Sequence, residues 1–309
     1  MIRRLLKAAL PGLILLYPSL PAFAATCSCA GVPVLIYLDT SAIEKGDFFA
    51  SYTADDHQIN DLVSGSDDVP DETGRDRASF SQVLSASYAF TDHWSVSALA
   101  SYVKHERKIG SSSFGEVSAS GIGDSVLLVR YSPFYLSPFS RHELSLGLGL
   151  RIPTGENDIV DVFLLSEDMQ PGTGAVGKIG WASYSYAFNQ AATLQAFTSI
   201  NYTHNEENDR HYRFGHEFNF SVGLSQSLGS RFGYSAVLRY RSTEPDRRSG
   251  FELPNSGGKW IDFIPAIRYA VTDRFGIALS GRIPVARDLN GVLQFTTSYS
   301  YAVTVSYGF

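Results

Sequence analysis

The clearest pattern of hydrophobic and polar positions lies at the end of the chain, between residues 295 and 309. Small or hydroxylic side chains, expected to face inward, alternate there with aromatic or branched ones, expected to face outward, namely Phe295, Thr297, Tyr299, Tyr301, Val303, Val305, Tyr307 and Phe309. A period of two indicates a β-strand, and strands of soluble domains usually have only ~5–6 residues. Because a tilted strand that spans a bilayer needs ~9–11 residues, this pattern favours a membrane strand over a long edge strand of a soluble sandwich.

The same alternation recurs along the chain and predicts eleven earlier strands. Their expected ranges are 47–54, 79–90, 94–106, 123–135, 143–152, 173–188, 192–204, 214–228, 231–242, 259–271 and 274–285. Long polar connections follow the odd-numbered strands, and short turns follow the even-numbered ones. The sequence therefore predicts an all-β fold, a transmembrane antiparallel β-barrel of 12 strands, with both termini and the short turns on the periplasmic side.

In two of these strands the alternation leads to specific predictions about which way side chains face. In the sixth, Ile179 and Trp181 have the opposite parity to Tyr184, Tyr186 and Phe188, which indicates a bulge. In the eighth, Phe214 and His216 have the parity expected of the lipid-facing side.

The composition agrees with strands rather than helices as the membrane-crossing elements. The mean hydropathy is −0.05, as expected for strands that alternate lipid-facing and water-facing residues. After the first 24 residues the longest apolar run, from Val32 to Leu38, is far shorter than the ~20 residues of a membrane helix. A membrane protein with this sequence must be a closed barrel, since an open sheet edge would leave backbone groups unpaired in lipid.

The first 24 residues have the features of a signal peptide. Arg3, Arg4 and Lys7 precede an apolar core, and Ala22-Phe-Ala24 fits a signal-peptidase site. We expect a signal peptide at 1–24, a periplasmic N-terminal segment at 25–46 and an outer-membrane β-barrel at 47–309. Cleavage removes three cations and changes the formal net charge from −6 to −9, which argues against nucleic acid as a partner.

Cys27 and Cys29 are the two cysteines of the chain, and they lie just after the expected cleavage site. Lipidation of Cys27, a disulfide favoured by an oxidising periplasm, a metal site and a segment without special chemistry are all open. Ala24-Ala-Thr26 fits signal peptidase better than lipoprotein processing, and no His or further Cys stands nearby to complete a metal site.

Several glycine-rich motifs mark the ends of the expected strands. They are Gly121-Ile-Gly-Asp124, Pro153-Thr-Gly155, Gln170-Pro-Gly-Thr-Gly174 and Thr272-Asp-Arg-Phe-Gly276. With these motifs the chain resembles, over roughly residues 40 to 309, the outer-membrane channel family named for the MetA pathway of phenol degradation. The resemblance implies a barrel that acts as a transporter, and the family's name comes from an association with aromatic catabolism. It implies no catalytic residues.

The polar side of each expected strand carries charged residues that would line the barrel interior. Six are basic and four acidic: Arg130, Arg151, Arg239, Arg241, Arg268, Arg282, Asp124, Glu143, Glu217 and Asp262. Rings of charge set the selectivity of pores, so these residues predict a preference for anionic solutes. The alternative is that the acids and bases pair with each other and fill the lumen, because a buried unpaired charge is costly.

Other candidate sites have weaker support. Gly121-Ile-Gly-Asp124 lacks the strand, loop and helix context of a phosphate site, so we expect Asp124 to accept hydrogen bonds at a strand start. Acids in the first long loop lack the spacing of a cation-binding loop, and we expect a solvated surface. An outer-membrane hydrolase would need a His with a Ser or Asn placed to serve it, and His216 has no adjacent Ser.

The function that the sequence favours is passage of small solutes, including aromatic or other hydrophobic compounds, across the bacterial outer membrane without a bound cofactor. The expected partners are membrane lipid, the solute and the outer-membrane assembly machinery, for which Tyr307 and Phe309 would form the terminal signal. The alternatives are a lipid-modifying enzyme and a plugged barrel with a structural or adhesive role.

Overall fold

The computed structural model describes residues 25–26, 45–110, 115–136 and 140–308 as an almost entirely β structure with one short 3-10 turn, η3 (Glu167–Met169). The barrel wall consists of β2 (Phe48–Gln58), β5 (Arg75–Ala89), β6 (Trp94–Ile109), β7 (Glu116–Ile122), β8 (Ser125–Phe134), β9 (His142–Ile152), β10 (Gly177–Ala187), β11 (Leu194–Asn205), β13 (Glu217–Leu228), β14 (Phe232–Thr243), β17 (Gly258–Ala270), β18 (Phe275–Leu289) and β20 (Tyr299–Gly308). Because β7 and β8 both pair with β6, these elements make twelve wall positions, and the predicted strand number is confirmed.

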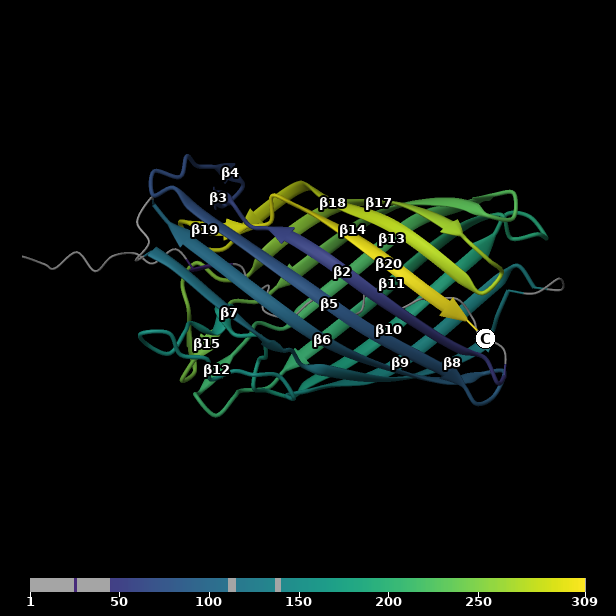
Figure 1. Cartoon of the computed structure of the whole chain (residues 1–309), viewed down its shortest axis with the longest axis horizontal. Coiled ribbons are helices and arrows are strands. Elements are labelled where there is room, and N and C mark those ends of the chain that lie inside the picture. The colour runs from purple at the N-terminus through teal and green to yellow at the C-terminus, as the bar shows by residue number, and fades with distance from the viewer. Residues whose placement is uncertain (1–24, 27–44, 111–114, 137–139, 309) are drawn as a thin grey trace, which may run out of the picture.

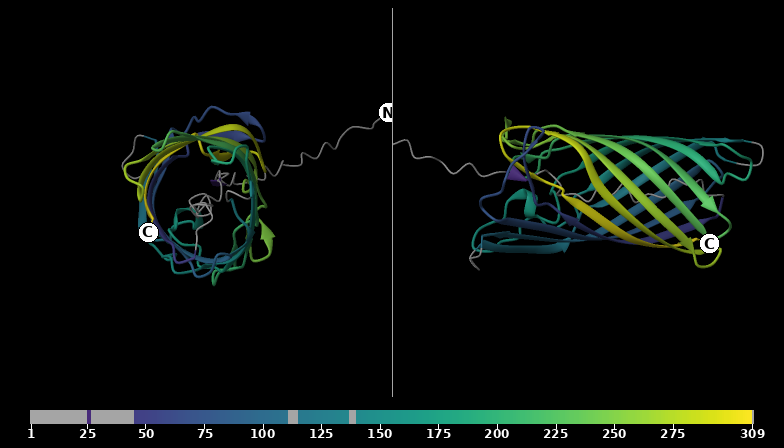
Figure 2. Two further views of the ribbon diagram at one scale, coloured as in Figure 1. Left: turned by 90° about the vertical axis from the view of Figure 1, so that its right-hand side faces the viewer. Right: turned by 90° about the horizontal axis from the view of Figure 1, so that it is seen from above.

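The sheet closes on itself without an edge. Each wall strand pairs antiparallel with its neighbours. The first wall strand, β2, pairs with the next one, β5, and also with the last one, β20, which closes the ring. Seen along its axis the wall is a closed ring, and seen from the side its strands are strongly tilted (Figures 1 and 2). All backbone groups of the wall can therefore be paired within it, as a membrane barrel requires. No helix among the described residues is long and apolar enough to span a membrane.

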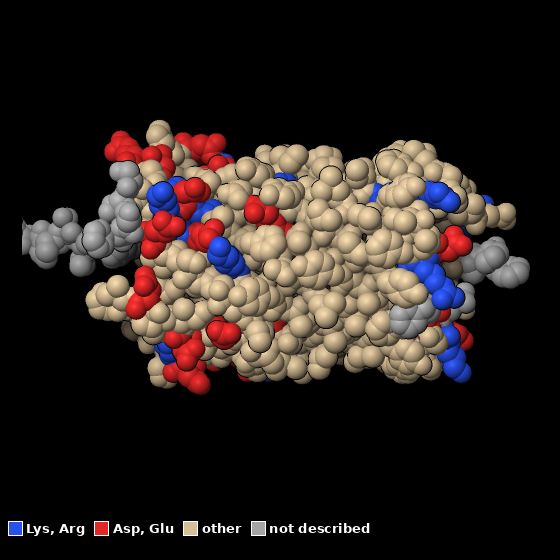
Figure 3. Space-filling view, in the orientation of Figure 1, with Lys and Arg blue, Asp and Glu red and all other residues tan. Residues whose placement is uncertain are grey.

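The outer face of the barrel is apolar, and the inner face carries small and polar side chains. Leu84, Leu148, Val222 and Leu279 are exposed on the outside, while the residues between them on the same strands are largely buried. In the space-filling view the charged side chains gather toward the two ends and leave a band without charge between them (Figure 3). Such a band is what lipid tails require of a barrel surface.

The two ends of the barrel differ as predicted. Residues 229–231 and 271–274 form short turns at one end, whereas 153–176 and 244–257 connect strands at the other. The prediction of a long loop directly after the third strand was wrong. Strands β6 and β7 continue the wall into that region, where Lys108 pairs with Glu116. The many Ser and Gly residues there still alternate with larger ones, so the backbone can pair.

The terminal strand is shorter than its sequence pattern predicts. The wall strand β20 begins at Tyr299, and Phe295 and Thr297, which we expected on the outside, are only 1% and 4% exposed. Phe295 belongs to β19 (Gln294–Thr296), which pairs with β3 (Asp61–Ser64) and packs against Ile59 and Leu62. The chain leaves the wall where the Ser298 hydroxyl donates a 2.8 Å hydrogen bond to Asp61 Oδ1. Alternation continues through this break, which is why the sequence did not reveal it.

The expected bulge in the sixth strand is also wrong. The pairing of β10 with β9 and β11 runs in continuous register, so Ile179 and Trp181 face inward and are buried. Register shifts occur instead beside Asp262 in β17 and after Tyr131 in β8. The sixth strand therefore presents apolar side chains on both faces, an arrangement that alternation cannot distinguish from a bulge.

Two small sheets cover the long-loop end. One joins β1 (Ala25–Thr26), β19, β3 and β4 (Asp67–Asp68), and the other joins β12 (Tyr212–Arg213), β15 (Arg247–Arg248) and β16 (Phe251–Glu252). Phe214, expected on the lipid side, is instead buried against Tyr212 beneath the second sheet, because the wall strand starts only at Glu217.

Some predictions fall where the structure gives no description. The signal peptide at 1–24, Cys27, Cys29 and Phe309 lie outside the described residues. Ala25–Thr26 pairs with β19 at the long-loop end. The assignment of residues 25–46 as a periplasmic segment stays a prediction.

Candidate functional site

Hydroxyl groups line much of the inner wall. Side chains on neighbouring strands form hydrogen-bonded pairs, namely Ser51 with Ser85 at 2.6 Å, Ser87 with Ser97 at 2.7 Å, Ser132 with Ser145 at 2.8 Å and Thr53 with Thr304 at 2.9 Å. Each partner alternates along its strand with a residue of the outer face, so the pairing follows from the period of two. Small hydroxylic side chains leave room inside the ring and keep hydrogen-bonding capacity for water or a solute.

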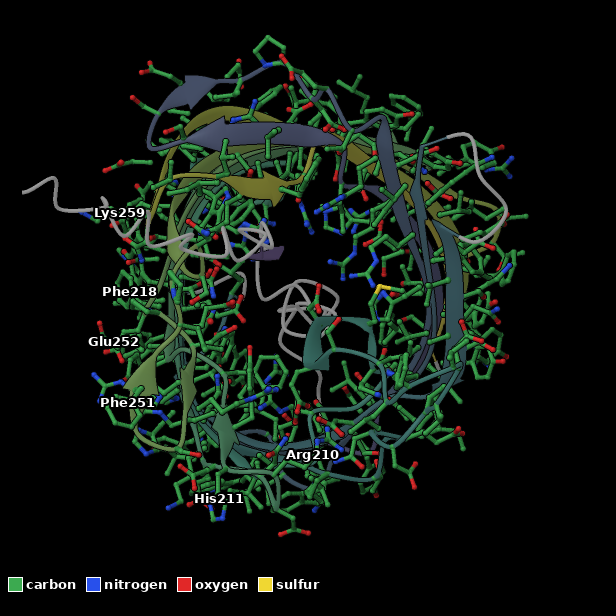
Figure 4. All side chains as sticks on the ribbon, turned by 90° about the vertical axis from the view of Figure 1, so that its left-hand side faces the viewer. Arg210, His211, Phe218, Phe251, Glu252 and Lys259 are labelled. Atoms are coloured by element: carbon green, nitrogen blue, oxygen red, sulfur yellow. The ribbon has the colours of Figure 1, made fainter. Side chains whose placement is uncertain are left out.

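The charged residues that we expected in the lumen all lie on the inner parity of the wall. Arg130, Glu143, Arg239, Arg241, Asp262 and Arg282 are buried on barrel strands, and Asp124 is buried just before β8. Arg151 and Glu217 are partly buried. Arg268 is exposed near the short-turn end, beside Gly233. From the long-loop end, side chains project into the ring, while Phe218 and Lys259 lie on its outer side (Figure 4).

Several acids and bases in the lumen form pairs. Arg239 forms a salt bridge with Asp262 across β14 and β17. Arg151 Nε lies 3.5 Å from Asp124 Oδ2, and Arg241 Nη1 lies 4.0 Å from Glu217 Oε2. The pairing alternative therefore describes part of the lumen. Arg239 Nε and Nη1 and Arg282 Nε, all buried, have no hydrogen-bond partner among the described residues.

Three arginines and one aspartate gather on three adjacent strands, and we call Arg239, Arg241, Arg282 and Asp262 the arginine sector. The Arg241 guanidinium lies over the Trp260 ring, 4.0 Å from its centroid. Arg282 Nη1 lies 3.3 Å from Nε2 of His57, a buried residue of β2 that lies beyond the expected end of the first strand at residue 54. The signal that was missed is the alternation of strand β2 beyond residue 54, which carries Asp55 and His57 to the inner face.

The opposite side of the lumen carries a patch of apolar side chains among polar ones. In the closed strand order, β17 lies across the ring from β8, and β14 lies across from β6. Leu99 of β6 and Val126 and Leu128 of β8 are buried on the inner face, and we call these three residues the apolar wall. Ser97 and Arg130 lie on the same inner face beside these residues. The lumen thus has a cationic side and, across from it, an apolar patch among polar residues, an arrangement that the sequence analysis did not predict.

The connection between β9 and β10, residues 153–176, folds over the long-loop end of the lumen, and we call it the mouth segment. Asp168 in this segment accepts a 2.6 Å hydrogen bond from Arg77 Nη1, and Arg77 itself, 1% exposed, projects from β5. Burial by itself would raise the pKa of Asp168, but the Arg77 guanidinium and a Ser166 hydrogen bond hold it below its usual value. The salt bridge therefore connects the mouth segment to the barrel wall.

A second ion pair connects the mouth segment to the next loop. Arg210 Nε donates a 2.8 Å hydrogen bond to Glu167 Oε1 and forms a salt bridge with the same carboxylate. The hydrogen bond to Glu167 raises the pKa of Arg210 above its ordinary value. Sequence reasoning placed Arg77, Asp168, Glu167 and Arg210 in loops and so missed that these residues meet at the mouth.

Three of the glycine-rich motifs meet at the base of the mouth segment. Asp124 Oδ2 accepts hydrogen bonds from the Thr173 backbone at 3.0 Å and from its hydroxyl at 2.5 Å, and Oδ1 accepts one from the Gly155 backbone at 3.2 Å. A Cβ at Gly155 would lie 2.6 Å from Gly172 Cα, so no larger residue fits there. The expectation that Asp124 accepts hydrogen bonds at a strand start is confirmed.

His216 has other partners than a hydrolase would need. Its Nδ1 accepts a 3.1 Å hydrogen bond from the Asn205 backbone, its Nε2 lies 3.2 Å from Arg213 Nη1, and its ring stacks on His204 at 4.1 Å. Among the described residues no group of three His, Cys, Asp or Glu side chains is arranged to hold a metal ion.

Comparison with solved structures supports the fold. The COG4313 outer membrane channel from Pseudomonas putida F1 has a TM-score of 0.72 and 11% identity, over 88% of this chain and 98% of that chain. The KdgM porin has a TM-score of 0.49 and 8% identity, over 84% and 99%. The first of these similarities shows the fold, which is that of an outer-membrane barrel.

Comparison of sequences identifies the family. None of the curated proteins is similar enough in sequence to match the chain. Residues 107–288 match the family described as "Putative MetA-pathway of phenol degradation". This region begins in β6, ends in β18, and includes the three motifs that meet at Asp124. Because the match spans more than half of its length, the chain belongs to this family.

Proposed function

We propose that the protein is an outer-membrane channel for small solutes, embedded in lipid and inserted by the outer-membrane assembly machinery. The observation that carries this proposal is the contrast between the two faces of one closed wall, which is apolar outside and lined inside by hydroxyl and charged groups. A continuous inner row of hydrogen-bonding side chains supports a hydrated path, since water and polar solutes need partners throughout a crossing. The long-loop end would face the outside of the cell.

The solutes of this channel include, in our proposal, aromatic and other hydrophobic compounds. The family's description names phenol degradation. The apolar wall of Leu99, Val126 and Leu128 offers an inner surface on which a ring could lie. Arg130, Arg151, Arg239, Arg241, Arg268 and Arg282, with the four acids, are the proposed selectivity residues, because charge inside a narrow pore selects solutes by sign.

A plugged barrel with a structural role is the second candidate, and one observation favours it. The mouth segment is held by the Arg77–Asp168 and Arg210–Glu167 pairs and covers one end of the lumen. We propose that it narrows the mouth of a conducting barrel. An enzymatic role lacks a supporting arrangement, because both ring nitrogens of His216 contact nitrogen donors rather than a serine hydroxyl.

Single-channel recording in a planar bilayer tests the proposal. The purified barrel should give discrete conductance steps in KCl, with a preference for chloride over potassium. The Arg239→Ala and Arg268→Ala variants should reduce that preference, while Arg247→Ala, which alters an exposed pair with Glu252, serves as the matched control. A correctly folded barrel that conducts nothing and takes up no aromatic solute into liposomes would refute the channel. Unchanged ion preference in both lumen variants would refute only the selectivity residues.

A further inference from the structure

Among the described residues, no group accepts a hydrogen bond from three of the buried nitrogens of the arginine sector. Arg239 is 3% exposed and Arg282 is 6% exposed, yet Arg239 Nε and Nη1 and Arg282 Nε have no partner among the described residues. A buried cationic donor without a partner is costly. A guanidinium can donate hydrogen bonds from two of its nitrogens to the two oxygens of a carboxylate. The unused donors therefore point to an anionic ligand.

The charge balance of the three strands agrees with an anion. Arg239 engages the Asp262 carboxylate, whereas among the described residues no salt bridge joins Arg282 to a carboxylate. Arg282 Nη1 can donate to Nε2 of His57 only when that nitrogen carries no proton, and a neutral imidazole supplies no negative charge.

The surface across the lumen determines what else the ligand must carry. Arg239 and Arg282 each lie seven positions beyond the short-turn end of their strands, which begin at Phe232 and Phe275. Leu128 lies six positions from the end of β8 at Phe134, and Leu99 lies five positions from Trp94. The cationic and apolar surfaces therefore face each other at a similar height, because β8 and β6 lie opposite β17 and β14.

We propose that the arginine sector and the apolar wall form a binding subsite for a small monocarboxylate with an apolar body, such as a ring. The carboxylate binds Arg239 and Arg282, and the apolar body packs toward Leu99 and Leu128. This inference rests on the proposed channel function, because the ligand must reach the lumen. It adds the class of solute for which this lumen is most selective.

Equilibrium binding to the purified barrel in detergent, with benzoate, phenol and acetate as probes, tests the subsite. Benzoate carries both features, phenol keeps the ring without the carboxylate, and acetate keeps the carboxylate without the ring. We expect benzoate to bind more tightly than either by about tenfold or more, the effect of one charge-assisted hydrogen bond or one buried apolar group.

Arg282→Gln is the informative variant, because within the described part of the chain Arg282 is in no salt bridge and its removal leaves no carboxylate there without its salt-bridge partner. It should weaken benzoate binding by roughly ten- to a hundredfold and change phenol binding by less than about twofold. Arg239→Lys keeps the charge opposite Asp262 and should lose part of the affinity. Leu128→Ser should weaken benzoate but not acetate. Arg247→Gln, at an exposed loop pair, is the matched control.

The outcomes separate this inference from the channel proposal. Heat-modifiable migration confirms that each variant is folded, and KCl conductance is recorded on the same preparations. A barrel that conducts but binds benzoate no better than phenol, or binds it equally well after Arg282→Gln, overturns the subsite and leaves the channel. A barrel that binds benzoate through Arg282 but does not conduct retains the subsite and refutes the channel.

Discussion

The mouth of the barrel and its middle use charged residues in different ways. At the mouth, Arg77 is paired with Asp168, Arg210 with Glu167, and the Asp124 carboxylate accepts hydrogen bonds from Thr173 and Gly155. In the middle, the arginine sector has three guanidinium groups on β14 and β18, and Asp262 on β17 engages one of them.

Arg77 Nε at the mouth also has no hydrogen-bond partner among the described residues, so the difference lies in the ion pairs. Those at the mouth join separate segments, whereas Arg282 in the middle is in no salt bridge among the described residues. A buried charge with a well-placed partner can connect two segments, whereas a donor without a partner is costly and persists where a ligand or solvent can satisfy it. We infer that the ion pairs at the mouth act as a clasp, in the sense that they hold the mouth segment against the barrel, and that the arginine sector is available to solutes. The following predictions test that division, beginning with the largest effect.

Gly155→Val should prevent correct assembly of the mouth. Its Cβ would lie 2.6 Å from Gly172 Cα and 2.8 Å from Asp124 Oδ1, and the backbone cannot retreat without breaking the Asp124 hydrogen bonds. We expect little heat-modifiable barrel in outer-membrane fractions. Gly180→Ala, on β10 with no atom near the added methyl, is the control and should assemble normally. Normal assembly of Gly155→Val would contradict the close junction.

Arg77→Gln should release the mouth segment from the wall. Breaking a buried ion pair by removing one partner costs ~3–5 kcal/mol, so the unfolding midpoint should fall and single-channel conductance should rise. Arg247→Gln breaks an exposed pair, for which ~0–1 kcal/mol is expected. If the two variants destabilise the barrel equally, the Arg77–Asp168 pair is not a clasp.

Acid should open the mouth only at low pH. Arg77 holds the folded-state pKa of Asp168 below the unfolded value of about 3.9. The stability that the Arg77–Asp168 pair adds to the folded state is therefore fully present above that value and is lost as the pH falls toward the folded-state pKa. We expect conductance to be constant from about pH 5 to 8 and to rise below about pH 4. Asp168→Asn should remove this step. A rise between pH 5 and 7 would implicate a different group.

Arg268→Gln should have the smallest effect. Arg268 faces the lumen near the short-turn end but is exposed, so water and salt screen its charge. We expect a modest loss of chloride preference, visible at low salt and absent at 1 M KCl. A change as large as that of Arg282→Gln, in ion preference or in benzoate binding, would mean that selectivity is set at the exit rather than in the middle of the barrel.

Alternation along the chain was sufficient to predict the barrel, since a period of two assigns each side chain to lipid or lumen once the wall is closed. The errors have a common cause. Phe295 and Phe214 keep the expected parity but lie on segments that have left the wall, and Trp181 has an apolar side chain on the inner face. Parity describes which side of a strand a residue occupies and not what lies on that side.

The candidate site was predicted residue by residue but not as an arrangement. Arg239, Asp262 and Arg282 were identified from their polar parity, and their inward placement follows from it. That Arg239 pairs with Asp262 depends on the register between β14 and β17, and that Arg282 contacts His57 depends on closure of the sheet between β2, β20 and β18. Neither can be read from one strand alone.

The sequence by itself determined the class of fold, the number of wall strands, the long and short ends and the inner or outer side of most residues. Each of these depends on local alternation and on loop length, which are properties of neighbouring residues. Only the tertiary structure decided that residues 153–176 fold into the mouth, that Asp124 holds Thr173, and that arginines face leucines across the lumen. Those features join segments far apart in sequence, and register, closure and packing bring them together.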